Sequence, residues 1–142
     1  MISVYLSGPI GGCTDEEVFG WRNRMKALLP RYNVIDPTVR DMRGKVMSRE
    51  DDKYVIEKDK AEIRQSRYLV VNPWKATFGT PMEVIYAYDV CNGCCVISVI
   101  PPGCPGDHPW IRYHSNVHVE TLEEAAEMIK YMDRHLEDSH YN

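Results

Sequence analysis

Two hydrophobic patterns alternate along the chain. Short continuous runs rich in β-branched and aromatic residues, such as YLVV and CVISVI, are typical of buried strands. Longer segments repeat an apolar residue every three or four positions, which is typical of helices with one buried face. The predicted strands cover 2–7, 33–36, 68–72, 95–100 and 117–119, and the predicted helices cover 14–29, 48–66, 80–91 and 122–136.

The alternation of strands with helices predicts a parallel sheet, because parallel neighbours need a crossover connection that a helix supplies. Continuous apolar strands indicate that both faces of this sheet are covered. A chain of 142 residues without repeats or internal linkers fits one domain. We therefore predict a single α/β domain over 1–142, with five parallel strands and helices on both faces.

Composition and charge mainly exclude classes of binding partner. The net charge is −4 and no basic run occurs, which argues against binding to a nucleic acid polymer. No apolar run approaches membrane-spanning length, and MISVYLSGPIGG lacks a charged leader followed by a long apolar stretch. We expect a soluble, cytoplasmic protein without a membrane partner, and this composition is compatible with a charged small ligand.

The five cysteines are an odd number in a chain without an export signal, so a disulfide framework is not expected. The segment CNGCC contains Cys91-x-x-Cys94, a spacing that occurs in zinc and redox sites. A second ligand pair at suitable spacing is missing from the sequence. Small residues packed at a helix end are the favoured interpretation, and no metal is expected.

Three loops rich in Gly and Pro follow predicted strands: SGPIGG, NPWKATFGT and PPGCPGDHPW. In open parallel sheets, ligands bind beyond the carboxyl ends of the strands, so these loops are expected to share one ligand-binding edge. SGPIGG does not have the spacing of the GxGxxG dinucleotide fingerprint. A ligand-facing loop and a plain turn remain equally open for it.

Two acidic residues each permit a structural and a functional interpretation. Glu83 stands three residues after Thr80 before an apolar run, which is the capping-box signature, and this stretch alone favours a cap over a nucleophile. Asp59 lies three residues after Ile56 and four before Ile63, on the apolar stripe of its helix. It lies either at the margin of that stripe or in a site, because burial of an unpaired carboxylate is costly.

Three segments in this order resemble the nucleoside 2-deoxyribosyltransferase family: YLSGPIGG, the segment around Asp59, and Gly79-Thr80-x-x-Glu83 with Ala87 on the same helix. The resemblance extends over most of the chain. It implies a flavodoxin-like, or Rossmann-like, sheet and a homodimer or higher homo-oligomer. It also implies cleavage of the N-glycosidic bond of a nucleoside or nucleotide, without a metal or organic cofactor.

The resemblance assigns roles to individual residues. Glu83 would attack C1′ of the sugar and form a glycosyl-enzyme ester, and Asp59 would hold the base or assist proton transfer to it. Tyr5 would orient the nucleophile. Gly8 would let the loop backbone approach the ligand closely. The implied substrate-binding positions are Gly8, Pro9, Ile10, Gly11, Thr77, Gly79, Thr80 and Ser115.

Departures from the family pattern leave the reaction open. Thr77 stands where many transferases have an aspartate that contacts the base. A hydroxyl there is similar to the related 2′-deoxynucleoside 5′-phosphate N-hydrolases, in which it helps to hold the phosphate. Ser115 lies at a place similar to a serine that those hydrolases take from a neighbouring subunit. Pro9, however, stands where they tend to have a serine.

Three functions are therefore predicted, in order. The first is cleavage of 2′-deoxynucleosides through a glutamyl deoxyribosyl-enzyme ester, with transfer to another nucleobase. The second is hydrolysis of 2′-deoxynucleoside 5′-monophosphates to free base and deoxyribose 5-phosphate. The third is a non-catalytic nucleotide-binding module, against which Glu83 and Asp59 argue, because binding alone needs no nucleophile. Arg40, Arg43 and Arg112 could supply charge to a phosphate but are interpreted as solvated surface residues.

Overall fold

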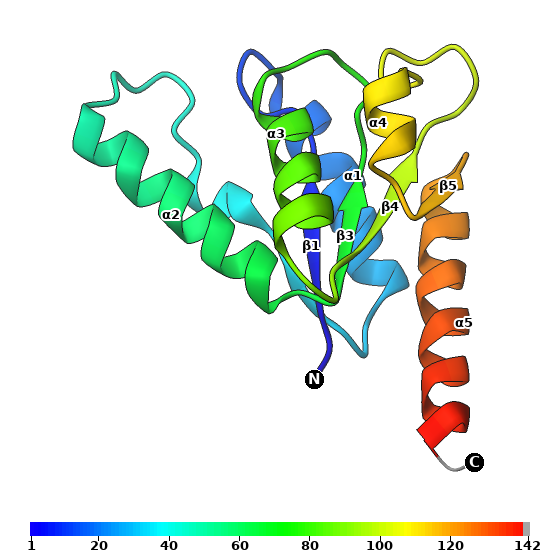
Figure 1. Ribbon diagram of the computed structural model, residues 1–142. Coiled ribbons are helices and arrows are strands. Elements are labelled where there is room, and N and C mark those ends of the chain that lie inside the picture. Colours follow the sequence, from blue (N-terminus) through cyan, green and yellow to red (C-terminus); the bar gives the residue numbers. More distant parts are fainter. Residues whose placement is uncertain (141–142) are drawn as a thin grey trace.

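A computed structural model of the chain describes residues 1–140, with side chains described through Leu136. Its sheet is parallel, five-stranded and ordered β2-β1-β3-β4-β5, which is the flavodoxin-like arrangement (Figure 1). The predicted fold class is confirmed. The strands are β1 Ser3–Ser7, β2 Asn33–Ile35, β3 Tyr68–Val71, β4 Cys95–Val99 and β5 Val117–Val119.

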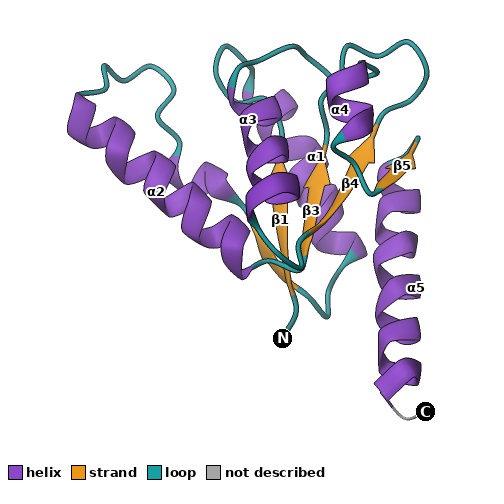
Figure 2. Ribbon diagram, viewed as in Figure 1, coloured by secondary structure: helices purple, strands orange, loops and turns teal. Residues whose placement is uncertain are grey.

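Helices cover both faces of the sheet (Figure 2). The helices are α1 Asp15–Leu28, α2 Arg49–Gln65, α3 Gly79–Ile85, α4 Pro109–Tyr113 and α5 Leu122–His140, with a 3₁₀ helix η1 at Pro37–Arg40 and a π-helix η2 at Tyr86–Val90. The sequence pattern predicted loops at η1 and α4, and one uninterrupted α-helix where α3 passes into η2. The two helices that were predicted as loops, η1 and α4, each begin with a proline, which suits the first helical turn. Each is too short to show the helical repeat of apolar residues by which the other helices were predicted.

The starts of α1 and α2 follow directly from local sequence. Thr14 accepts a hydrogen bond from the Glu17 backbone N–H at 3.2 Å, and the Glu17 carboxylate accepts one from the Thr14 N–H at 2.9 Å. Ser48 and Asp51 form the same reciprocal pair. Each capping box satisfies two N–H groups that a helix start leaves free, so both predicted starts are confirmed.

The sheet separates two apolar layers. On one face, alternate strand residues such as Val4, Leu6 and Val70 pack under α1 and α5. On the other face, Tyr5, Leu69 and Val71 belong to a second cluster. Ile63 of α2, Val84 of α3 and Ala87 of η2 also belong to that second cluster. Because side chains alternate along a strand, Tyr5 and Ser7 both face the α2–α3 layer.

The strand order reverses between β1 and β3, because the chain leaves β1 for β2 on one side and β3 for β4 on the other. Ser7 and Val71 end these two strands side by side. The loops that follow them, 8–14 and 72–78, therefore meet at the switch point where ligands of such sheets bind. Among the residues described, no helix is long and apolar enough to cross a membrane.

Candidate active site

Glu83 lies in the second turn of α3, and the capping interpretation of this residue is wrong. The helix begins at Gly79 with Phe78 as its N-cap, and the Phe78 side chain makes no capping hydrogen bond within the described chain. Thr80 lies inside the helix, is buried, and accepts a hydrogen bond from the Thr77 hydroxyl at 3.2 Å. The local signature predicted the helix but placed its N-cap at Thr80, two residues after the observed N-cap.

Several buried polar atoms lack a hydrogen-bond partner among the described residues, and we call them the unpartnered atoms. They are Tyr5 Oη, Ser7 Oγ, Trp21 Nε1, Arg22 Nε, Arg40 Nε and Glu83 Oε2. Buried polar groups are normally hydrogen-bonded, and three of the exceptions, Tyr5, Ser7 and Glu83, lie near one another, so they point to a site that a ligand or water completes. Tyr5, Arg22 and Glu83 are also close enough to shift one another's pKa values.

The Glu83 carboxyl group lies in an environment that resists its charge. Burial raises the pKa of Glu83 from 4.5 to about 7, and the negative charge of Asp59 adds to this effect. The hydroxyls of Tyr5 and Ser7 and the Arg22 guanidinium act in the opposite direction. At neutral pH the carboxyl group is therefore divided between its neutral and ionised forms.

Tyr5 has no exposed surface. Burial, followed by the charges of Glu83 and Asp59, raises the pKa of Tyr5 far above its ordinary value. The phenol therefore stays protonated and can act on a carboxylate only as a hydrogen-bond donor. A buried, protonated phenol beside Glu83 is compatible with the orienting role predicted for Tyr5.

Asp59 reaches the same region from α2. Its Oδ1 accepts a hydrogen bond from Arg40 at 2.8 Å, and Arg40 also binds Glu62 at 2.7 Å. Burial raises the pKa of Asp59, although Arg40 opposes the shift. Ile56 is half exposed and Ile63 is buried, so Asp59 lies at the margin of the apolar stripe and is held by a partner.

The interpretation of Arg40 as a solvated surface residue is wrong, because its side chain is only 11% exposed and is paired with two carboxylates. Arg43 is also held, by Asp41, Asp15 and the Cys13 carbonyl. Arg112, by contrast, is a largely exposed residue paired with Asp107, in agreement with its prediction. Ion pairing between distant segments leaves no mark on the local sequence.

Arg22 was not among the predicted site residues, although it is fully buried in α1. Its Nη1 donates to the Val18 carbonyl at 2.7 Å and its Nη2 to the Gly8 carbonyl at 2.9 Å. A signal was present, because Arg22 stands four residues after Val18 and three before Met25, both buried on the same helix face.

The glycine-rich loop after β1 is shaped by packing. A Cβ built on Gly8 would lie 2.6 Å from the Trp21 ring, so any side chain there would displace Trp21. Gly12 has φ +72°, a left-handed conformation that favours glycine, and its carbonyl accepts a hydrogen bond from Lys75 at 3.3 Å. Pro9 is buried, and the loop's other predicted binding positions, Ile10 and Gly11, are partly buried and exposed, respectively.

The other predicted binding positions fall in two places. Thr77, Gly79 and Thr80 lie at the start of α3, next to Glu83 in the chain. Ser115 lies between α4 and β5, where its Oγ is 2.6 Å from both Ser98 Oγ and the Ile111 carbonyl oxygen. Its hydroxyl is therefore bonded within its own chain, and a contribution to a neighbouring subunit stays a prediction.

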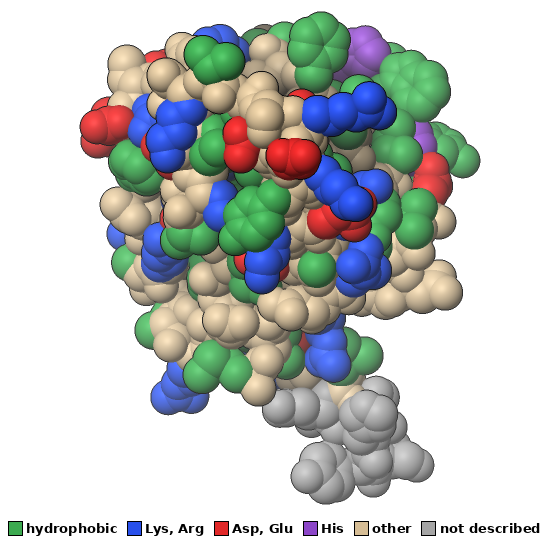
Figure 3. Space-filling model, turned by 90° about the vertical axis from the view of Figure 1, so that its left-hand side faces the viewer, with side chains coloured by type: hydrophobic (Ala, Val, Ile, Leu, Met, Phe, Trp, Pro, Cys, Tyr) green, Lys and Arg blue, Asp and Glu red, His purple; other side chains and the backbone are tan. Residues whose placement is uncertain are grey.

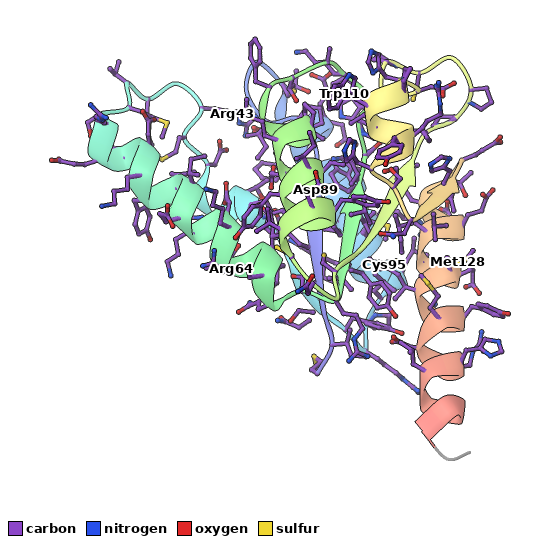
Figure 4. The ribbon with its side chains drawn as sticks, viewed as in Figure 1. Arg43, Arg64, Asp89, Cys95, Trp110 and Met128 are labelled. Carbon is purple, nitrogen blue, oxygen red and sulfur yellow. The ribbon has the colours of Figure 1, made fainter. Side chains whose placement is uncertain are left out.

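The molecular surface gives little further guidance. The face on the α2 side carries interspersed positive and negative side chains (Figure 3). Arg43 and Trp110 lie toward the carboxyl end of the sheet, whereas Cys95 lies at the other end (Figure 4). A hollow of about 670 Å³ lies at that other end, beside Tyr68 and α5. No metal-binding group of three or more His, Cys, Asp or Glu occurs among the described residues.

Comparison with known proteins shows similarity in structure without detectable similarity in sequence. No family model and no curated protein sequence matches the chain. The solved 2-deoxyribosyltransferase from the psychrotolerant bacterium Bacillus psychrosaccharolyticus superposes with a TM-score of 0.66 at 16% identity, over 87% of this chain and 90% of the other. A conserved protein from Enterococcus faecalis V583 superposes with a TM-score of 0.65 at 16% identity, over 93% and 99%. The chain therefore has the fold of a known 2-deoxyribosyltransferase.

Proposed function

We propose that the chain is an enzyme of the nucleoside 2-deoxyribosyltransferase type, which cleaves 2′-deoxynucleosides and transfers the deoxyribosyl group to another nucleobase. The observation that carries this proposal is the buried Glu83 Oε2 without a described partner, in the neighbourhood of Tyr5 and Asp59. The shared fold supports it. A binding module gains nothing from burying a carboxylate in this way, because such burial costs stability.

In the first step, a Glu83 carboxylate oxygen attacks C1′ of the sugar. The C1′–N bond breaks and its electron pair passes to the base nitrogen, which takes a proton from Asp59. The products are a neutral free base and a deoxyribosyl ester of Glu83. Asp59 suits the proton-transfer role because burial raises its pKa and increases the share of the neutral acid.

In the second step, a nitrogen of the incoming base attacks C1′ and Glu83 leaves as a carboxylate. The incoming nitrogen loses its proton to Asp59, which restores the starting state of both acids. Tyr5 donates a hydrogen bond to the Glu83 oxygen that does not attack and so directs the other oxygen toward the sugar. Because Glu83 must form an ester with the sugar, its attacking oxygen should be held without a permanent hydrogen-bond partner.

Hydrolysis of 2′-deoxynucleoside 5′-monophosphates is the second candidate. The Thr77–Thr80 hydroxyl pair favours it, since hydroxyls can donate hydrogen bonds to an anion that a carboxylate would repel. Against it, Arg22, Arg40 and Arg43 are all paired with carboxylates, which leaves them less able to bind a phosphate. The nucleoside reaction therefore stays first, and assembly as a homo-oligomer stays a prediction from the family resemblance.

The deciding experiment is chromatography of the purified protein with deoxynucleosides or their 5′-monophosphates, with and without a second free base. A new nucleoside that appears only with the added base is the expected result. Free base and deoxyribose 5-phosphate from the monophosphates alone would replace the first candidate with the second. Glu83→Ala should abolish either reaction, and Glu57→Ala, at an exposed glutamate of α2, is the matched control.

A further inference from the structure

Arg22 is an unusual residue for its position. It has no exposed surface, although arginines are almost never fully buried unless they are paired. Two of its nitrogens donate to the backbone carbonyls of Val18 and Gly8. Its Nε faces Asp36 Oδ1 at 3.7 Å, which is an ion-pair distance too long for a hydrogen bond.

Arg22 joins three parts of the molecule at the carboxyl edge of the sheet. It belongs to α1, which packs on the face opposite α3. Gly8 is the first residue after β1, and Asp36 is the first residue after β2. The guanidinium therefore lies against the ends of these neighbouring strands, and β1 is the strand that carries Tyr5 and Ser7.

The charge of Arg22 reaches the candidate nucleophile. It lowers the pKa of Glu83 against the effect of burial. Glu83 is faced by Tyr5 and Ser7 from β1, Asp59 from α2 and Arg22 from α1. Arg22 is the cation in this set.

We propose that Arg22 is a positioning residue of the Glu83 site, which fixes the Gly8 end of β1 through its hydrogen bonds and favours the carboxylate form of Glu83 through its charge. The inference rests on the proposed function, because only an ionised Glu83 can attack C1′. It adds a residue that touches no substrate to the groups that prepare the nucleophile. Asp36 has a defined part in this arrangement, since it partly neutralises the Arg22 charge.

Two substitutions should move the ionisation of Glu83 in opposite directions. Arg22→Met removes the positive charge, so the acidic limb of the pH profile of kcat/KM should move up by about one pH unit, with about tenfold less activity below it. Asp36→Asn leaves Arg22 in place without its counter-charge, so the limb should move down. Arg24→Met, at an exposed arginine of the same helix, should leave the limb in place.

The Glu83 ionisation should also be followed without any substrate, by a ¹³C NMR titration of protein labelled at the glutamate carboxyl carbons. Glu83→Gln identifies the Glu83 signal. Opposite shifts of its titration midpoint in Arg22→Met and Asp36→Asn would support the inference even if no nucleoside is cleaved, in which case the proposed function fails alone. Unmoved midpoints in folded variants of both residues would overturn the inference. If Arg22→Met does not fold, Asp36→Asn alone decides.

Discussion

Two tyrosines on adjacent strands lie in opposite layers of the protein, each near a carboxyl group. Tyr68 of β3 donates a hydrogen bond to Asp133 Oδ1 of α5 at 2.6 Å, and both residues are at least nine-tenths buried. Tyr5 of β1 lies beside Glu83 of α3, and neither Tyr5 Oη nor Glu83 Oε2 has a partner among residues 1–140. The chemical groups are the same, but only the first pair forms a hydrogen bond of standard geometry, whereas Tyr5 lies close enough to Glu83 for its hydroxyl to lower the pKa of the acid.

The difference separates a structural pair from the pair that we propose to be reactive. A satisfied buried hydrogen bond stabilises the fold by about 1 kcal/mol, whereas an unsatisfied one costs stability unless a ligand completes it. The hollow of about 670 Å³ is lined by Tyr68 and Asp133, at the pair that is already satisfied. We therefore locate the candidate active site by the buried polar atoms that lack hydrogen-bond partners, and not by the size of a hollow.

Exchanging each acid for its amide gives the largest contrast. Glu83→Gln should reduce kcat by about 10³-fold or more, because an amide oxygen cannot form the ester intermediate. Asp133→Asn should leave kcat within about twofold, because it lies outside the site. Steady-state kinetics of both variants measures this, and equal losses would show that the two pairs do not differ in role.

The pH dependence of stability should reveal the free-energy cost of burying the Glu83 carboxylate. Its folded pKa of about 7 is above the ordinary value of 4.5, so the folded state holds the proton more tightly. The stability that this provides is present below pH 4.5 and is lost as the pH rises through 7. The loss is on the order of 3 kcal/mol.

Glu83→Gln should therefore be more stable than the unmodified protein at pH 8 and gain little at pH 4.5. Denaturant unfolding at both pH values measures the difference, and Glu57→Gln controls for the loss of one negative charge. A Glu83→Gln variant with the same gain at both pH values would contradict the raised pKa.

Removing each tyrosine hydroxyl should separate activity from stability. Tyr5→Phe should lower kcat about tenfold while costing little stability, because the Tyr5 hydroxyl lowers the pKa of Glu83 but forms no hydrogen bond of standard geometry within the described chain. Tyr68→Phe should cost about 1–2 kcal/mol of unfolding free energy, because it leaves Asp133 without its donor, and should leave kcat unchanged. Kinetics and denaturant unfolding of both variants test the comparison, which fails if Tyr5→Phe is the less stable protein.

Two buried serines should repeat the contrast on a smaller scale. Ser7→Ala should lower kcat by about threefold with little loss of stability, since the Ser7 hydroxyl lowers the pKa of Glu83 but forms no hydrogen bond of standard geometry within the described chain. Ser66 donates to the Glu62 carbonyl at 2.7 Å, so Ser66→Ala should cost about 1 kcal/mol and leave kcat unchanged. The same two measurements apply, and a stability loss in Ser7→Ala would show that Ser7 is a structural residue.

The sheet and most helices could be predicted from sequence because their signals are local. The capping boxes of α1 and α2 and the apolar strands each specify an element within a few residues. The same signature was misleading at Thr80 and Glu83, because the N-cap of α3 is Phe78, two residues before Thr80. There, the tertiary setting of the acid overrides the local cap.

The site was predicted less completely than the fold. Tyr5, Asp59 and Glu83 could be named from a family resemblance, but Arg22 and Arg40 could not be recognised as buried charges. Their burial depends on which segments fold against them: Gly8 and Asp36 around Arg22, and α2 against Arg40. Such contacts join residues far apart in sequence, so no local pattern encodes them.

The placement of residues on the sheet, helices and loops has an evolutionary consequence. The residues proposed to take part in the reaction, Tyr5, Asp59 and Glu83, all belong to strands or helices. Two positions predicted to contact the substrate, Gly11 and Thr77, belong to loops that can change in length or sequence without moving those elements. Under the proposed function, preference for one base or acceptor can therefore diverge by loop exchange while the chemistry is inherited intact, and loop libraries on this scaffold become a direct route to altered nucleoside products.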